Sequence, residues 1–410
     1  MLPISKERRQ EIAYYFSVIN PLYIVIPVYS LYLAEPGVSA SLLDLMHGMH
    51  VVLAIFAVFT IVLQPLAAYL VADRVSRKGS WLLALLFFKA GVLAYVIDKS
   101  PARLVIADAV YKLGLAFRGL NPEVIVYEAL KERGEERVAR VLIRGELFSL
   151  VAAGLFLVFG EVLAAYDPQL PVIASILVLF VMFVVSLVFM EDVRHYQSSA
   201  RGGDGRYPGF WRAAADFAKL FSRGESLPAV LAIYAIVVTG YVLAPSSILL
   251  LYKWLPGSHA MLEAVLYTVA GTTALLLAHL TLRLSGQHTG DALASVALPA
   301  IALCAVTPLL VVGDTLVTSI IVFLLLMLIP RVYRPLLFTY LQRFIDGRLR
   351  ATVNSLLFST ASLAALAVPV LGGMLGFNTI EGMLHLILGF NAVLLLACIL
   401  RRPLAHASQS

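Results

Sequence analysis

A long apolar run ends at a dense group of charges in the stretch Ala68-Tyr69-Leu70-Val71-Ala72-Asp73-Arg74-Val75-Ser76-Arg77-Lys78. The apolar run starts near residue 44 and ends at Ala72. One helix needs about 20 apolar residues to cross a bilayer. The pattern therefore predicts a membrane-spanning helix that ends at Ala72 and a charged turn beyond it.

The whole chain has the same apolar character as this stretch. Its 410 residues have a mean hydropathy of +0.90, with 60% hydrophobic and 14% charged residues. Soluble globular chains carry about 25% charged residues. This composition excludes a soluble protein and indicates an integral membrane protein that crosses the bilayer many times.

Twelve apolar stretches are long enough to be spans. In lipid, backbone amides and carbonyls must be satisfied within the segment, so spans of this length are helical. The sequence therefore predicts an all-α integral membrane protein. Its spans lie near 12–34, 44–72, 81–97, 102–128, 143–165, 170–190, 228–254, 260–284, 291–312, 315–341, 350–375 and 380–400.

The basic residues between the spans predict the orientation. Twenty-three of the 31 Lys and Arg residues fall in the termini, in the loops on the side of the termini or at the span ends there, and three fall on the opposite side. Cytoplasmic loops carry such an excess. We expect a multi-pass protein of the cell membrane with both termini in the cytoplasm. Because the net charge of +6 reflects topology, it does not indicate a nucleic-acid partner.

A polar segment divides the chain into two halves. The segment 191–227 combines a Gly- and Ser-rich linker with a sequence that can form a short amphipathic helix on the inner membrane surface. We expect six-helix bundles at 1–190 and 228–410. Arg118, Pro122 and Tyr127 recur in the second half at a constant offset of 213, as Arg331, Pro335 and Tyr340. The halves are therefore interpreted as a parallel repeat.

The turn after the second span resembles a known signature. Asp73, Arg74, Arg77 and Lys78 match the Gly-x-x-x-Asp-Arg-x-Gly-Arg-Lys loop of the major facilitator superfamily, while Tyr69 and Ser76 replace its two glycines. Two further stretches resemble the same family: 114–144 is similar to its bacterial efflux-type members, and 350–352 is similar to its Arg-Ala-Thr start of the eleventh span.

This resemblance implies two pseudo-symmetric six-helix bundles that move a small organic solute by alternating access, without ATP, cofactor or catalysis. The efflux-like stretch favours proton-coupled export, and we expect a monomer. An organic-anion carrier is the alternative, and a membrane protein that does not transport is a remote one.

The outer Asp44, His47 and His50 are interpreted as interfacial polar residues rather than metal ligands, because their side chains spread over about 120°.

Charges at the inner ends of the spans predict a latch. The Asp73 carboxylate can accept hydrogen bonds from the first backbone amides of span eleven, near Thr352. Arg77 can pair with Glu128 at the end of span four. The contact of Asp73 joins the two halves, so it would form only when the inner side is closed. For Arg74, an ordinary interfacial charge is the equal alternative.

One face of span four is polar at membrane depth, where polar residues are expensive and usually functional. Asp108, Lys112 and Glu123 lie within about 60° of one another on the helical wheel. Either Asp108 carries a coupling proton, with Glu123 as the second candidate, or Asp108 and Lys112 neutralise each other.

In the resembled family, spans one, four, seven and ten line the central cavity. Their polar residues include Asn20, Tyr23, Tyr234 and Tyr241.

Three arginines suit an anionic substrate. Arg118 and Arg331 occupy equivalent positions of the two halves, and Arg334 lies one turn from Arg331. A guanidinium binds a carboxylate or phosphate at two points. The alternative is that these side chains reach the inner interface and anchor helix ends.

Overall fold

The computed structural model describes residues 5–25, 61–97, 101–191, 208–254, 269, 273, 292–311, 315–374 and 380–407. Within these residues all regular structure is helical, as expected. The expected span at 260–284 lies almost wholly outside the described residues, as do Asp44, His47 and His50.

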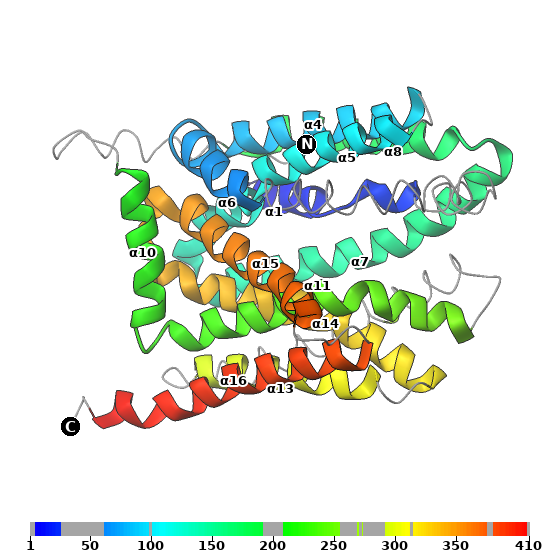
Figure 1. Ribbon diagram of the computed structural model, residues 1–410. Coiled ribbons are helices and arrows are strands. Elements are labelled where there is room, and N and C mark those ends of the chain that lie inside the picture. The colour runs from blue at the N-terminus through cyan, green and yellow to red at the C-terminus, as the bar shows by residue number, and fades with distance from the viewer. Residues whose placement is uncertain are drawn as a thin grey trace, which may run out of the picture.

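The N-terminal half, as we use the term, comprises the described residues up to Glu191. Figure 1 shows its helices packed side by side. They are α1 (Lys6–Ser17), η1 (Pro21–Ile24), η2 (Ala68–Asp73), α4 (Arg77–Ile97), α5 (Pro101–Arg118), α6 (Asn121–Leu130), η3 (Lys131–Arg133), α7 (Glu135–Tyr166) and α8 (Leu170–Phe189).

The C-terminal half comprises the described residues from Pro208 onward. Its elements are α10 (Phe210–Ser222), α11 (Leu227–Trp254), α13 (Ala292–Val311), α14 (Leu316–Leu341), η5 (Gln342–Phe344), η6 (Gly347–Leu349), α15 (Arg350–Met374) and α16 (Ile380–Ala407). The described helices correspond closely to the predicted spans.

The predicted fourth span is the main difference, because it is two helices rather than one. Gly119, between α5 and α6, has a φ of +45°, a left-handed conformation that favours glycine. Pro122 follows in the first turn of α6, where a proline starts a helix without losing a hydrogen bond. The break changes the direction of α6 and so decides where Glu123 and Glu128 lie.

We call the end of the bundle that carries the turns at 74–76, 131–134 and 342–349 the basic end. The helix expected in the linker, α10, runs across this end at the left of Figure 1 and makes an angle of 100° with α11. Ala213 and Leu220 of α10 are buried, whereas 82% of Trp211 is exposed. The helix is therefore amphipathic and is packed on the C-terminal half by its apolar face.

Apolar clusters fill each half, and others contain residues of both halves. In the cluster that joins α7 to α14, α7 contributes Ile143, Leu147, Leu150, Ala153 and Leu157, and α14 contributes Phe323, Met327, Leu328 and Val332. Helices in lipid associate through close packing and buried polar contacts rather than through exclusion of water. The α7–α14 contact thus needs additional polar links to hold the halves together.

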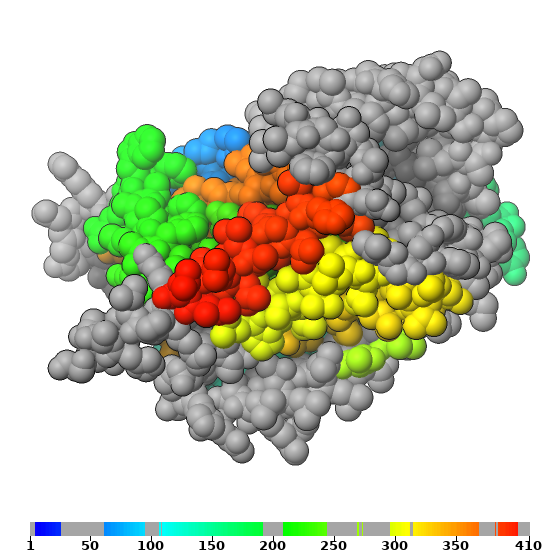
Figure 2. Space-filling model, turned by 60° about the horizontal axis from the view of Figure 1, so that its bottom comes forward, coloured from blue at the N-terminus to red at the C-terminus, as the bar shows by residue number. Residues whose placement is uncertain are grey.

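Buried polar contacts also fix α16 to the C-terminal half. The Asn391 amide donates to Thr239 Oγ1 of α11 at 2.9 Å and to the Cys304 carbonyl of α13 at 3.1 Å. Figure 2 shows α16 in red beside α13 in yellow on one face of the molecule. One amide thus holds three helices of this half in register.

The side chain of Lys89 on α4 lies against two aromatic rings of α8. Its ammonium lies 4.9 Å and 4.5 Å from the ring centroids of Phe180 and Phe183 on α8. Aromatic faces stabilise such a cation within the bundle. Lys89 therefore joins α4 to α8.

The glycine of α7 at position 160 permits a close approach that a larger residue would prevent. A Cβ on Gly160 would stand 2.1 Å from the carbonyl oxygen of Ile24 in η1. We predict that Gly160→Ala destabilises the protein by about 1–3 kcal/mol, because the backbone of Ile24 must move. The measurement is the midpoint of thermal unfolding in detergent.

Gly240→Ala is the matched control, because a Cβ on Gly240 of α11 would meet no described atom within 4 Å. Alanine has the higher helix propensity, so the control should leave the midpoint unchanged or raise it. Equal midpoints for the two variants would contradict the close approach of α7 and η1.

Candidate functional site

Asp73 is the centre of the contact between the halves at the basic end. Its carboxylate accepts hydrogen bonds from the backbone amides of Ala351 at 3.2 Å and Thr352 at 2.8 Å, and from the Thr352 hydroxyl at 2.7 Å. The Asp73 side chain is fully buried. The carboxylate therefore caps the N-terminus of α15, where unpaired backbone amides and the helix dipole favour negative charge.

The local backbone aims Asp73 at the other half. Residues Ala68–Asp73 form a π-helix, η2, in place of the last α-helical turn. Each hydrogen-bonded turn of a π-helix contains one residue more than a turn of an α-helix, and such turns are frequent at functional sites. The wider turn rotates Asp73 relative to the α-helix before it.

Arg77 joins Asp73 to a second acid. It donates to the Asp73 carboxylate at 2.9 Å and to the carbonyl oxygen of Gly347 in η6 at 2.6 Å. Its other terminal nitrogen lies 3.9 Å from the Glu128 carboxylate. The predicted pair of Arg77 and Glu128 is thus present as a loose contact.

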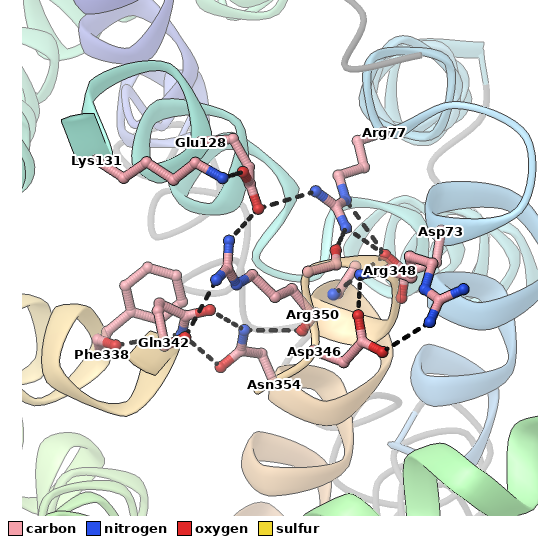
Figure 3. Close-up of polar contacts among 12 residues, drawn as sticks. Asp73, Arg77, Glu128, Lys131, Phe338, Gln342, Asp346, Arg348, Arg350 and Asn354 are labelled. Carbon is pink, nitrogen blue, oxygen red and sulfur yellow. Dashed lines mark hydrogen bonds and ion pairs between the residues drawn. The ribbon is translucent and has the colours of Figure 1, made fainter. Parts of the chain in front are cut away.

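Glu128 forms an ion pair with an arginine of the opposite half. Arg350, the first residue of α15, donates to the Glu128 carboxylate, and Lys131 donates to it at 2.7 Å (Figure 3). The Arg350 guanidinium also stacks 4.6 Å from the centroid of Tyr127. Sequence reasoning placed Arg350 only in a family motif and did not foresee this ion pair. The break at Gly119, which turns α6 toward α15, is what makes it possible.

Polar groups of the C-terminal half hold Arg350 in place. Arg350 donates to the Gln342 carbonyl at 3.2 Å, and the Gln342 and Asn354 side-chain amides bond to each other at 3.1 Å. All three side chains are buried or nearly so. The start of α15 therefore presents a fixed set of hydrogen-bond donors to Asp73 and Glu128.

Tyr69, which stands where the family motif has glycine, contacts the linker. Its hydroxyl donates to the Pro208 carbonyl at 3.2 Å, and its ring meets Phe210 of α10 edge to face at 5.5 Å. The Arg74 guanidinium lies 5.1 Å from the Tyr69 centroid. Arg74 thus supports the contact of η2 with the linker.

A second charged cluster crosses the halves deeper in the bundle. Arg334 of α14 donates to the Glu146 carboxylate of α7, and the same nitrogen lies 3.9 Å from Glu123 of α6. The Glu123 oxygen Oε2 is buried and has no hydrogen-bond partner among the described residues. A cavity of about 10 Å³, enough for about one water molecule, adjoins the cluster and is also lined by Tyr14 and Phe358.

Arg118 is turned into the N-terminal half. It lines a cavity of about 70 Å³ together with Asn20, Trp81 and Tyr111, and its guanidinium lies 6.0 Å from the Trp81 ring. Of the three arginines predicted for an anionic solute, Arg334 reaches acids of the other half and Arg118 lines a cavity of its own half.

The other predicted residues are dispersed. The Arg331 guanidinium donates to the Met327 carbonyl of its own helix at 3.1 Å. Tyr23 packs on the α7–α14 cluster, and Tyr234 donates to Thr360 within the C-terminal half at 2.7 Å. Tyr241 is 52% exposed. Lys112 is half-buried on α5, and the side chain of Asp108 lies outside the described residues.

Together these contacts define a polytopic helical membrane protein whose two halves are fastened to each other at one end by buried charges. This is the construction of a secondary transporter. A family model of the major facilitator superfamily matches residues 13–369, and the chain belongs to that superfamily. It is therefore a membrane transporter with the twelve-helix fold of this family, as the sequence motif implied.

Solved structures show the same fold. The human organic anion transporter MFSD10 (TETRAN) aligns over 97% of this chain and 100% of its own, with a TM-score of 0.69 and 16% identity. A point variant of the Escherichia coli fucose:proton symporter FucP aligns over 96% of this chain and 97% of its own, with a TM-score of 0.64 and 14% identity. FucP in the outward conformation aligns over 97% of this chain and 99% of its own, with a TM-score of 0.65 and 15% identity. No curated protein sequence matches this chain.

We predict that Asp73→Asn loosens the basic end, because asparagine lacks the charge that holds the α15 N-terminus. The expected weakening of the contact is roughly 1–3 kcal/mol. The reporter is Ser355→Cys, made with Cys304 and Cys398 replaced by serine. Ser355 is fully buried, and its hydroxyl lies 3.2 Å from the point where a Cβ on Gly119 would stand. Maleimide labelling of this cysteine should increase in the Asp73→Asn variant.

Asp216→Asn is the control for this prediction. Asp216 is an acid of the basic end whose ion pair, with Lys219 at 2.7 Å, stays inside α10. Its substitution should leave labelling at the wild-type rate. Equal labelling of Asp73→Asn and wild type would show that the Asp73 contact does not hold the halves together.

Proposed function

We propose that this protein exports a small organic solute in exchange for protons, by alternating access, with the basic end facing the cytoplasm. The observation that carries the proposal is the Asp73 carboxylate of one half on the α15 N-terminus of the other. Such a contact exists only while the halves are closed at this end. It can therefore act as a reversible latch between two access states.

The orientation and the direction rest on the sequence. The excess of basic residues at the basic end favours a cytoplasmic location, and the similarity of 114–144 to efflux-type members favours export. Proton coupling is supported by the carboxylates of Glu123 and Glu146 inside the bundle, since buried ionisable groups mark proton pathways in membranes. One of the structures with the same fold is a fucose:proton symporter.

The test is solute-dependent proton movement in proteoliposomes. A thermal-shift screen of drugs, carboxylates, phosphate esters and sugars first identifies a ligand, because a true ligand stabilises the purified protein by mass action. We predict that this ligand, added on the basic-end side, is transported against its gradient when the opposite side is acidic. The rate should fall by about tenfold or more in Asp73→Asn and stay at the wild-type value in Asp216→Asn. Ligand equilibration without accumulation under any pH gradient would contradict proton coupling.

An organic anion is the second candidate solute. Arg118 and Asn20 line the 70 Å³ cavity, and no described carboxylate lies within ion-pair distance of Arg118. A guanidinium beside an aromatic wall suits a carboxylate with an apolar body. The human protein with the same fold is an organic anion transporter.

This candidate predicts that carboxylates raise the midpoint of thermal unfolding and that Arg118→Gln abolishes the shift. Arg212→Gln, which removes an exposed arginine of α10, is the matched control and should keep it. Stabilisation by organic cations alone would exclude the anion and favour export of cationic compounds.

A further inference from the structure

The cavity beside Arg118 contains a positive charge that the described residues do not balance. Its volume is about 70 Å³, and all its described lining residues belong to the N-terminal half. Arg118 is the only charged residue among them. Arginine stays protonated in proteins, so this charge is permanent. The cavity is therefore a site inside one half, apart from the charged contacts that join the halves.

The Arg118 guanidinium has hydrogen-bonding capacity that the described residues do not use. Its Nε is buried and donates to none of them, and the described acids inside the bundle pair with another arginine. The Phe117 carbonyl at the end of α5 is not an acceptor for it. That oxygen already accepts from Ser80 Oγ at 2.7 Å and from the Asn121 amide at 2.9 Å. A buried charged donor without an acceptor is destabilising, and an anion would remove this cost.

Asn20, which precedes η1, provides a second donor to the same cavity. Its Oδ1 accepts from the Leu22 backbone amide at 3.2 Å. Because this bond occupies the oxygen, the NH₂ group is the end of the side chain that is left for another partner. The Ser17 hydroxyl, in contrast, donates to the Tyr14 carbonyl at 2.7 Å. Arg118 and Asn20 thus offer hydrogen-bond donors to the cavity, which suits an anion and not a cation.

The size and the wall of the cavity limit the anion that fits. A water molecule needs about 10–15 Å³ of such space, so the cavity holds only a few, whereas pockets for drug-sized ligands measure about 300–1,000 Å³. The wall is otherwise largely apolar and includes Trp81, Phe88, Val92, Leu179 and Met182. Such a wall makes a strongly hydrated or divalent ion costly. One guanidinium also balances only one negative charge.

We propose that this cavity binds one small monovalent anion, namely a halide, nitrate or a carboxylate of one or two carbon atoms, between the Arg118 guanidinium and the Asn20 amide. The bound anion neutralises Arg118 and joins the end of α5 to the break between α1 and η1. The inference depends neither on export nor on proton coupling, because the site lies within one half. A larger organic anion would need the cavity to widen.

Quenching of tryptophan fluorescence by bromide tests the proposal. Trp81 lines the cavity, is 1% exposed and has its ring centroid 6.0 Å from the Arg118 guanidinium. Trp211→Phe and Trp254→Phe leave it as the only tryptophan. In this parent protein, bromide added in exchange for gluconate should quench with saturation, and chloride or formate should reverse the quenching. Arg118→Gln should weaken bromide binding by about tenfold or more.

A second variant keeps the test independent of the fold of Arg118→Gln. Asn20→Asp is isosteric and keeps the acceptor for the Leu22 amide, but it places a carboxylate beside Arg118. Bromide binding should be lost in this variant. Its midpoint of thermal unfolding in gluconate should rise, because the new carboxylate takes the place of the anion.

Three controls accompany these variants. Arg212→Gln removes an exposed arginine of α10 and should bind bromide as the parent does. Acrylamide, an uncharged quencher, should quench Trp81 equally in Arg118→Gln and in the parent if the wall is intact. A protein that keeps only Trp211, which is 82% exposed, should show bromide quenching that rises without saturation.

The outcomes separate this inference from the proposed function. Quenching that never saturates, or that saturates equally in Asn20→Asp, would overturn the anion site. Displacement of bromide by benzoate or octanoate as effectively as by formate would overturn the size limit and favour the organic-anion solute. A saturable bromide site in a protein that transports nothing would contradict only the proposed function.

Discussion

One buried carboxylate organises the basic end of this molecule. The Asp73 carboxylate accepts hydrogen bonds from two backbone amides and a hydroxyl in the first turn of α15, and it accepts another from Arg77. Because the donors belong to one half and the carboxylate to the other, the contact depends on the position of both. Arg77, Glu128 and Arg350 then extend it, so that charges on α4, α6 and α15 are satisfied together only when the halves are closed (Figure 3).

The charged contacts between the halves differ in how much they can resist separation. The pair of Glu135 and Arg343 is partly exposed and contributes little. The contacts of Asp73 and Glu128 are nearly inaccessible to solvent. The cluster at Arg334 lies deeper and touches a small cavity.

Much of the fold follows from the sequence, and a large part of the site does not. The boundaries of α7, α8, α11, α14 and α15 agree with the apolar runs to within several residues, since a bilayer imposes length and hydropathy on each span. The meeting of Asp73 and Thr352 also followed from the motif. In contrast, Glu146 gave no signal, because it follows the charged first turns of α7 and resembles one more interfacial charge. Its position opposite Arg334 depends on the packing of α7 against α14.

Composition, periodicity and one charged turn are enough to establish the membrane environment, the helical spans and the family. Which charges meet depends on the tertiary structure. The break at Gly119 turns α6, and the π-helix at Ala68–Asp73 rotates Asp73 toward α15. Arg334, and not Arg331, reaches the acids of the other half. The spacing of charges along a helix fixes its polar face. Which residue that face meets on a neighbouring helix depends on the angle and depth at which the two helices pack. The sequence of one helix does not specify either quantity.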